Sequence, residues 1–65
     1  MVLSASASTV LSYARARAVG RFAEIGDDIG LPDRIVISAC KELQAAGIIS
    51  GFEVSEDSVE CVELK

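Results

Sequence analysis

The sequence of 65 residues contains no histidine and no tryptophan, and it has only two cysteines and one proline. Without histidine, a zinc site would need carboxylates beside two thiolates, which is a poor match to the tetrahedral structural sites of zinc. The sequence also shows no Gly-rich phosphate loop and no nucleophile with an apparent base. We therefore expect no metal and no cofactor, and an enzyme is the function class that the sequence supports least.

Long apolar runs are missing as well. No segment approaches the ~20 apolar residues that cross a bilayer, and the start of the chain lacks a basic region followed by an apolar one. Hydrophobic residues nevertheless make up 51% of the chain and charged residues 25%, which is typical of a globular protein. We expect a soluble, cytoplasmic protein with a single domain over residues 1–65, and a flexible Ser- and Ala-rich segment over 1–7.

The charge is unevenly distributed along the chain. Its net value of −4 argues against simple nucleic-acid binding, yet residues 1–21 contain three arginines and no acid. Residues 22–65 contain ten acids against three bases, a net −7. The chain therefore has a basic end and an acidic body, and the two are either solvated surface or regions that take part in association.

A stripe of apolar residues at helical spacing predicts a first helix. It begins after Ser8 or Thr9, each a candidate N-cap, and Gly20 ends the pattern. The residues on the stripe are Val10, Leu11, Ala14 and Ala18.

A second helix is predicted from Phe22 to Ile29. Phe22, Ile25 and Ile29 recur at spacings of three and four and would point inward. Gly26 allows another helix to cross closely, and Gly30 suits the left-handed residue that ends a helix.

A third helix is predicted from about Asp33 to Ala46. Pro32 presets the backbone of its first turn, Asp33 places negative charge at its N-terminus, and Gly47 ends it. The second and third helices together have the punctuation of a helix-turn-helix. The core positions of the third helix are Val36, Ala39 and Leu43.

After Gly47 the apolar period changes from about 3.6 to 2, which indicates strands. Phe52 and Val54 alternate with polar residues, a turn is expected over 55–58, and a second strand over 59–64. The order of three helices followed by a two-stranded hairpin predicts an α+β fold, a small winged helix-turn-helix.

The sequence AGIISGFEV, after a helix ending KELQAAG, resembles the KLE-x-AG-[LVI]-I ending of the reading helix in many winged-helix regulators. Over about Ala23 to Gly51, DRIVISACKELQAAGII is similar to the reading helix of the C-terminal DNA-binding domain of the CodY regulators. This resemblance covers less than half of the chain. It implies a sequence-specific transcriptional regulator, or the DNA-binding domain of one, that reads the major groove with the helix at about 33–46.

Residues off the apolar stripe near the start of that helix would face the bases. Arg34 suits a bidentate contact with guanine, Ile37 a thymine methyl group, and Ser38 a base or a phosphate. The full set on this helix is Asp33, Arg34, Ile37, Ser38 and Lys41, where Lys41 would contact phosphate. Additional phosphate contacts would come from Arg15, Arg17 and Arg21 if the first helix lies near double-stranded DNA.

The expected hairpin offers no base to a phosphate. It carries Glu53, Glu56, Asp57 and Glu60, each of which repels phosphate at short range. The alternative function is therefore a protein-interaction module, docking or DNA-mimicking, whose acidic hairpin binds a protein partner without contacting DNA.

Two further features remain open at this point. We expect a homodimer that packs through the first helix, with Leu3, Val10 and Tyr13 as interface residues. Cys40 and Cys61 either form a disulfide or stay as two buried thiols, and the second is favoured because a free cysteine behaves as a small core hydrophobe.

Overall fold

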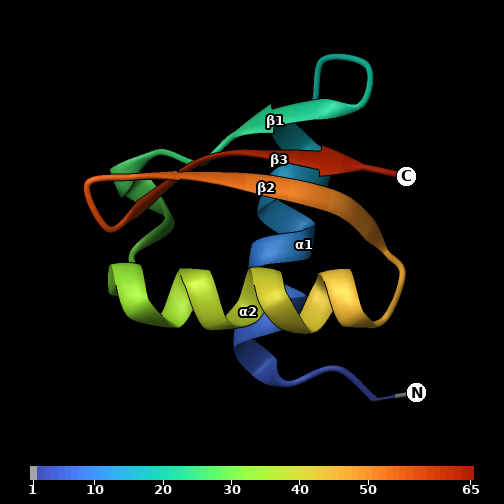
Figure 1. Ribbon diagram of the computed structural model, residues 1–65, viewed down its shortest axis with the longest axis horizontal. Helices are drawn as coiled ribbons and strands as arrows, with labels where there is room; N and C mark the ends of the chain where they lie inside the picture. The colour runs from blue at the N-terminus through green and yellow to red at the C-terminus, as the bar shows by residue number, and fades with distance from the viewer. Residues whose placement is uncertain (1) are drawn as a thin grey trace.

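Two helices cover one face of a three-stranded antiparallel sheet (Figure 1). The computed structural model describes residues 2–65. The elements are α1 (Ala5–Arg17), β1 (Phe22–Glu24), the single 3₁₀ turn η1 (Asp27–Ile29), α2 (Asp33–Ala45), β2 (Ile49–Ser55) and β3 (Ser58–Leu64). The strand order is β1-β3-β2, so that the last strand of the chain lies in the middle.

The predicted fold of three helices and a two-stranded hairpin is wrong. Phe22–Glu24 forms a strand, and one turn of 3₁₀ helix comes after it in place of a second α-helix. The cause is the burial pattern: Ala23 is buried opposite Val62 of β3, while its two neighbours point to the other face of the sheet. Buried and exposed residues therefore alternate with the period of 2 of a strand over this segment, where we expected the period of 3.6 of a helix. The structure is α+β, with two helices and three strands.

The core lies between the sheet and the two helices. Small residues on α1 and α2 let the helices approach each other, and β-branched residues fill the sheet side. The buried side chains are Ala7, Val10, Leu11 and Ala14 of α1, Val36, Ala39, Cys40 and Leu43 of α2, and Ala23, Ile49, Val59 and Val62 of the strands.

The first helix begins at Ala5, within the segment that we expected to be flexible. Its N-cap is Ser4, whose hydroxyl accepts a hydrogen bond from the amide of Ala7 at 3.2 Å. Glu42 of α2 in turn accepts hydrogen bonds from the amide of Ser4 at 2.8 Å and from its hydroxyl at 2.9 Å. This carboxylate ties the start of α1 to α2, while Met1 lies outside the described residues.

The second half of the chain agrees closely with the predicted pattern. α2 spans Asp33–Ala45 against the predicted 33–46, and Gly47 ends it with a φ of 75°. The amide of Ile48 returns to the carbonyl of Leu43, which completes the C-terminal cap. β2 and β3 form the predicted hairpin, with a β-bulge between the Glu53–Cys61 and Val54–Val59 pairs.

The hairpin turn holds two non-glycine residues in the left-handed region. Glu56 has a φ of 51° and Asp57 a φ of 64°, the signs that a two-residue type I′ turn requires. Asparagine and glycine reach these angles at lower cost than glutamate.

Replacing Glu56 by Asn and Asp57 by Gly should raise the free energy of unfolding by about 0.5–1 kcal/mol, because the turn is then less strained. Urea denaturation checks this. Glu53→Asn is the matched control: Glu53 lies in β2, where asparagine is disfavoured, and this change should not stabilise the protein. A turn variant no more stable than the original chain would contradict the prediction.

Candidate functional site

One side of α2 faces outward along its whole length. Arg34, Ser38, Lys41 and Ala45 are all exposed and lie three or four residues apart, so they follow one line on the helix surface. We call these four residues the α2 stripe. The buried residues of α2 lie on the opposite side of the helix.

The two carboxylates of α2, Asp33 and Glu42, accept hydrogen bonds from residues outside the helix. Asp33 accepts a hydrogen bond from the Ser58 hydroxyl at 2.9 Å, and Glu42 holds Ser4. Arg34 and Lys41 have no ion-pair partner among residues 2–65, where the single ion pair is between Arg17 and Asp28. The α2 stripe therefore carries both bases of the helix and neither of its acids.

Ile37 lies on the flank of the α2 stripe. Its side chain is half-buried and packs against the core cluster, so part of its surface is used within the chain. Of the residues predicted to face bases, Arg34 and Ser38 lie on the stripe itself, together with the predicted phosphate contact Lys41. Asp33 and Ile37 lie beside it.

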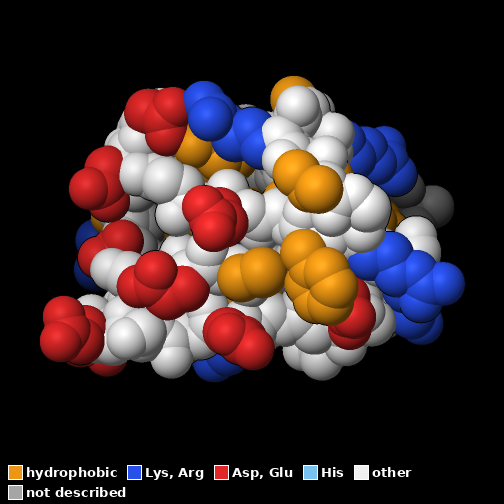
Figure 2. Space-filling view, turned by 90° about the horizontal axis from the view of Figure 1, so that it is seen from above, with side chains coloured by type: hydrophobic (Ala, Val, Ile, Leu, Met, Phe, Trp, Pro, Cys, Tyr) orange, Lys and Arg blue, Asp and Glu red, His pale blue; other side chains and the backbone are white. Residues whose placement is uncertain are grey.

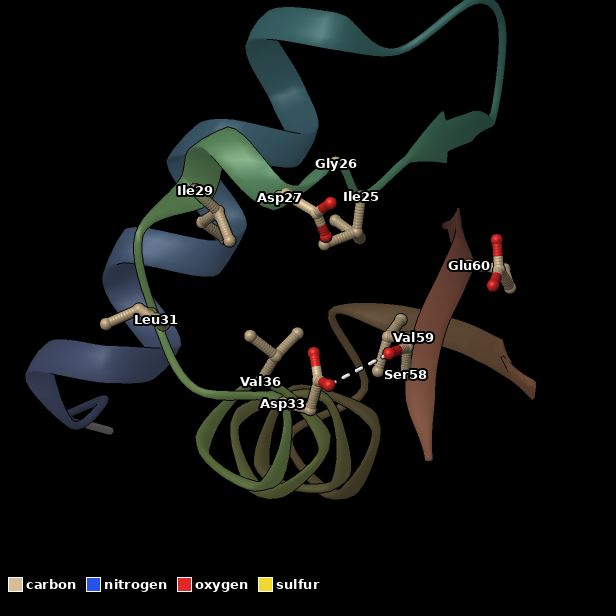
Figure 3. Close-up of a pocket in the computed structure, with 10 residues that line it drawn as sticks. All are labelled: Ile25, Gly26, Asp27, Ile29, Leu31, Asp33, Val36, Ser58, Val59 and Glu60. Carbon is tan, nitrogen blue, oxygen red and sulfur yellow. Dashed lines mark hydrogen bonds between the residues drawn. The ribbon is translucent and has the colours of Figure 1, made fainter. Parts of the chain in front are cut away.

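The acidic hairpin stands next to the N-terminus of α2. The Ser58–Asp33 hydrogen bond joins the two elements, and it is visible at the edge of the hollow in Figure 3. This hollow of about 360 Å³ lies between η1, the start of α2 and β3. Asp27, Asp33 and Glu60 line it along with apolar side chains, and no base does, so it is not suited to phosphate.

The arginines of the basic end do not join the α2 stripe. Figure 1 shows that the C-terminal end of α1 and the turn after it lie beside β1, at the far side of the molecule from α2. Arg17 also has its own partners: its Nη2 lies 2.5 Å from Oδ2 of Asp28, and its guanidinium lies 4.4 Å from the centre of the Tyr13 ring. The structure thus separates Arg15, Arg17 and Arg21 from Arg34 and Lys41.

Tyr13 connects α1 to η1, an interaction that we did not predict. Its hydroxyl donates to the carboxylate of Asp28 and accepts from the amide of Gly26 at 3.3 Å. The hydrogen bond to Asp28 raises the pKa of Tyr13, and the same bond lowers the pKa of Asp28, helped by the charge of Arg17. Gly26 is needed here because a Cβ would lie 2.8 Å from Oδ1 of Asp28.

The residues expected at a dimer interface on the first helix are used inside the chain. Val10 is 1% exposed, and Leu3 packs against the core cluster. Tyr13 holds Asp28.

The two cysteines are free thiols. Cys40 is buried, and burial raises its pKa to about 11, so it stays protonated at neutral pH. Cys61 is half-buried on β3. Among residues 2–65, no three His, Cys, Asp or Glu side chains gather as a metal site would require.

No family model matches the chain, and the comparisons with curated proteins and with solved structures found no match. Within residues 2–65, neither helix has the length and apolar character needed to cross a bilayer.

Asp28→Asn should lower the free energy of unfolding at pH 7, because it removes the carboxylate that Tyr13 and Arg17 contact. A lowered pKa in the folded state means that this stabilisation is present above the unfolded pKa of about 3.9 and is lost as the pH falls through the folded value. The gap between the variant and the original chain should therefore narrow as the pH falls below the unfolded value. Urea denaturation across this pH range measures it.

Asp27→Asn is the control for this change. Asp27 is exposed next to Asp28 and makes no side-chain hydrogen bond among the described residues, so its replacement should have little effect at either pH. A constant gap for Asp28→Asn over the whole range would contradict the assigned ion pair.

Proposed function

We propose that the protein binds double-stranded DNA through the α2 stripe, as a sequence-specific transcriptional regulator or the DNA-binding domain of one. One observation carries the proposal: α2 directs both of its bases outward, unpaired among residues 2–65, and bonds both of its acids to its own chain. The resemblance of this segment to the reading helix of the CodY regulators supports the same proposal.

The spacing of the α2 stripe fits a helix that enters a major groove. At 1.5 Å per residue, Arg34 and Lys41 are about 10 Å apart along the axis, within reach of a few neighbouring base pairs. Arg34 is the second residue of α2, so it lies at the N-terminal end of the helix. Arg34 then reads guanine, Ser38 contacts a base or a phosphate, and Lys41 contacts phosphate.

The acidic hairpin limits how strongly any DNA is held. Glu56 and Asp57 are exposed at its tip, and the Ser58–Asp33 bond keeps the hairpin close to the start of α2. Their charges oppose phosphate attraction, which is the part of binding that does not depend on sequence. Such a protein depends on base contacts for its affinity, which favours selectivity over tight non-specific binding.

Fluorescence anisotropy with labelled duplex DNA at about 50 and 200 mM salt tests the proposal. Two cationic contacts in each copy predict a loss of roughly tenfold in affinity over this range. Absence of binding at the lower salt concentration would reject the proposal. It would support the alternative, a protein-docking module that binds through its acidic hairpin.

Alanine substitutions separate the two bases once a preferred duplex has been selected from a random pool. Arg34→Ala should cost about 1–3 kcal/mol on that duplex and relax the preference at one base pair, while Lys41→Ala should weaken all duplexes alike. Arg15→Ala is the control: it removes an exposed base of α1 and should have little effect. If Arg34→Ala lowered the affinity for every duplex equally, the assignment of Arg34 as a residue that reads a base would be wrong.

Neutralising the hairpin tip should increase binding. Glu56→Gln with Asp57→Asn removes two charges that repel phosphate, so affinity for all duplexes should rise and the ratio of specific to non-specific affinity should fall. The same anisotropy titrations measure both quantities. Unchanged affinity would mean that the hairpin lies away from the phosphates of bound DNA.

A further inference from the structure

Neither helix within residues 2–65 lies over the second face of the sheet (Figure 1). We call this the outer face. The strand register places Glu24, Cys61 and Glu53 side by side in one row across it, and Phe22, Glu63 and Gly51 in the next. Residues directly opposite each other in antiparallel strands share a face, so these two rows form one continuous surface.

Apolar side chains are exposed in the middle of the outer face beside Glu63, whose carboxylate accepts a hydrogen bond from the Ser50 hydroxyl at 2.7 Å. Phe22 is 56% exposed and Val19, bridged to it in the preceding turn, is 84% exposed. Phe22 and Cys61 border two hollows, one of about 430 Å³ on the side of β1 and one of about 280 Å³ toward β2. An exposed ring between two hollows is a shape that can fit against a copy of itself, because each ring can enter a hollow of the other.

Charge on this side of the molecule is divided between its ends. In Figure 2 most acidic side chains lie toward one end and most basic ones toward the other, with hydrophobic side chains between them, although a basic group at the upper edge lies beside an acidic one. Arg21 lies beside the end of β3, since the amide of Leu64 bonds to the carbonyl of Arg21. Glu24, Glu53 and the hairpin tip lie further along β3, at the acidic end.

We propose that the outer face binds a second copy of this chain, with a two-fold axis that lies between the two sheets near Phe22, parallel to them and perpendicular to the line from the acidic end to the basic end. That rotation places the acidic end of each copy over the basic end of the other and brings the apolar centres together. A purely basic partner would match the acidic half but would meet Arg21 at the other. A second copy complements both halves at once.

This pairing directs the two α2 stripes away from each other. Each α2 lies on the side of its sheet opposite to the outer face, so the stripes face outward at the two ends of the dimer (Figure 1). The inference stands without DNA binding, because no residue of the α2 stripe takes part in it.

Sedimentation velocity without DNA, from about 10 µM to about 1 mM protein, tests the proposal. We expect a monomer–dimer equilibrium that weakens as salt is raised from about 50 to about 500 mM. Phe22→Thr should raise the dissociation constant about tenfold or more, since it removes the central ring but keeps a residue suited to a strand. A monomer throughout the range would overturn the proposal.

Val54→Thr is the matched control. Val54 is 47% exposed, but it pairs with the buried Val59 and therefore belongs to the other face of the sheet. Its replacement should change the dissociation constant less than about twofold. Equal effects of Phe22→Thr and Val54→Thr would place the contact elsewhere and overturn the assignment.

Charge reversal gives a second test that does not depend on the ring. Arg21→Glu and Glu53→Lys should each weaken their own homodimer, whereas a mixture of the two variants should form a heterodimer because opposite charges then face each other at both ends. A mixture that associates no better than either variant alone would overturn the two-fold arrangement. Circular dichroism of each variant verifies that it is folded.

Discussion

The pairing of β1 with β3 is the constraint on which the rest of the structure depends. Three residues form this strand, and Ala23 reaches the core only because Val62 stands opposite it. The same pairing places Phe22 on the outer face. The segment between β1 and α2 then forms a single turn of 3₁₀ helix, η1. The covered face of the sheet and the outer face both result from it. A chain of this length buries a modest share of its surface, so even a short strand contributes substantially to the core.

Local signals predicted the second half of the fold, and distant contacts account for what was missed. Pro32, Gly47 and the change of period set α2 and the hairpin, because each acts within a few residues. β1 is too short to show a period, and its partner lies almost forty residues away. The cap on Ser4 has the same origin, since its carboxylate comes from Glu42 in another helix. Sequence spacing placed Arg34, Ser38 and Lys41 on one side of α2, but gave no indication that Arg15, Arg17 and Arg21 lie across the molecule.

Net charge is a poor guide to this surface, because the position of each charge on its element decides what a partner meets. The chain is acidic overall, yet the α2 stripe carries bases and no acid, since Asp33 and Glu42 lie beside it and bond to Ser58 and Ser4. Asp28 is likewise held by Tyr13 and Arg17. The acids left free gather on the hairpin and the outer face. Because Figure 2 shows bases as well as acids on the sheet side, the local arrangement of charges, and not the net charge, orients an approaching charged molecule.

The two edge strands of the sheet determine whether further strands can add to it. β1 offers three residues at one edge, and β2 at the other is interrupted by two irregularities in its register. Short and bulged edge strands are poor templates for adding further strands, which is how natural sheets avoid growing into fibres. Contact through the outer face would also bury that surface in both partners, so that it would not be available to a third copy. If the outer faces pair as proposed, assembly is closed at two copies and Phe22 is covered in both.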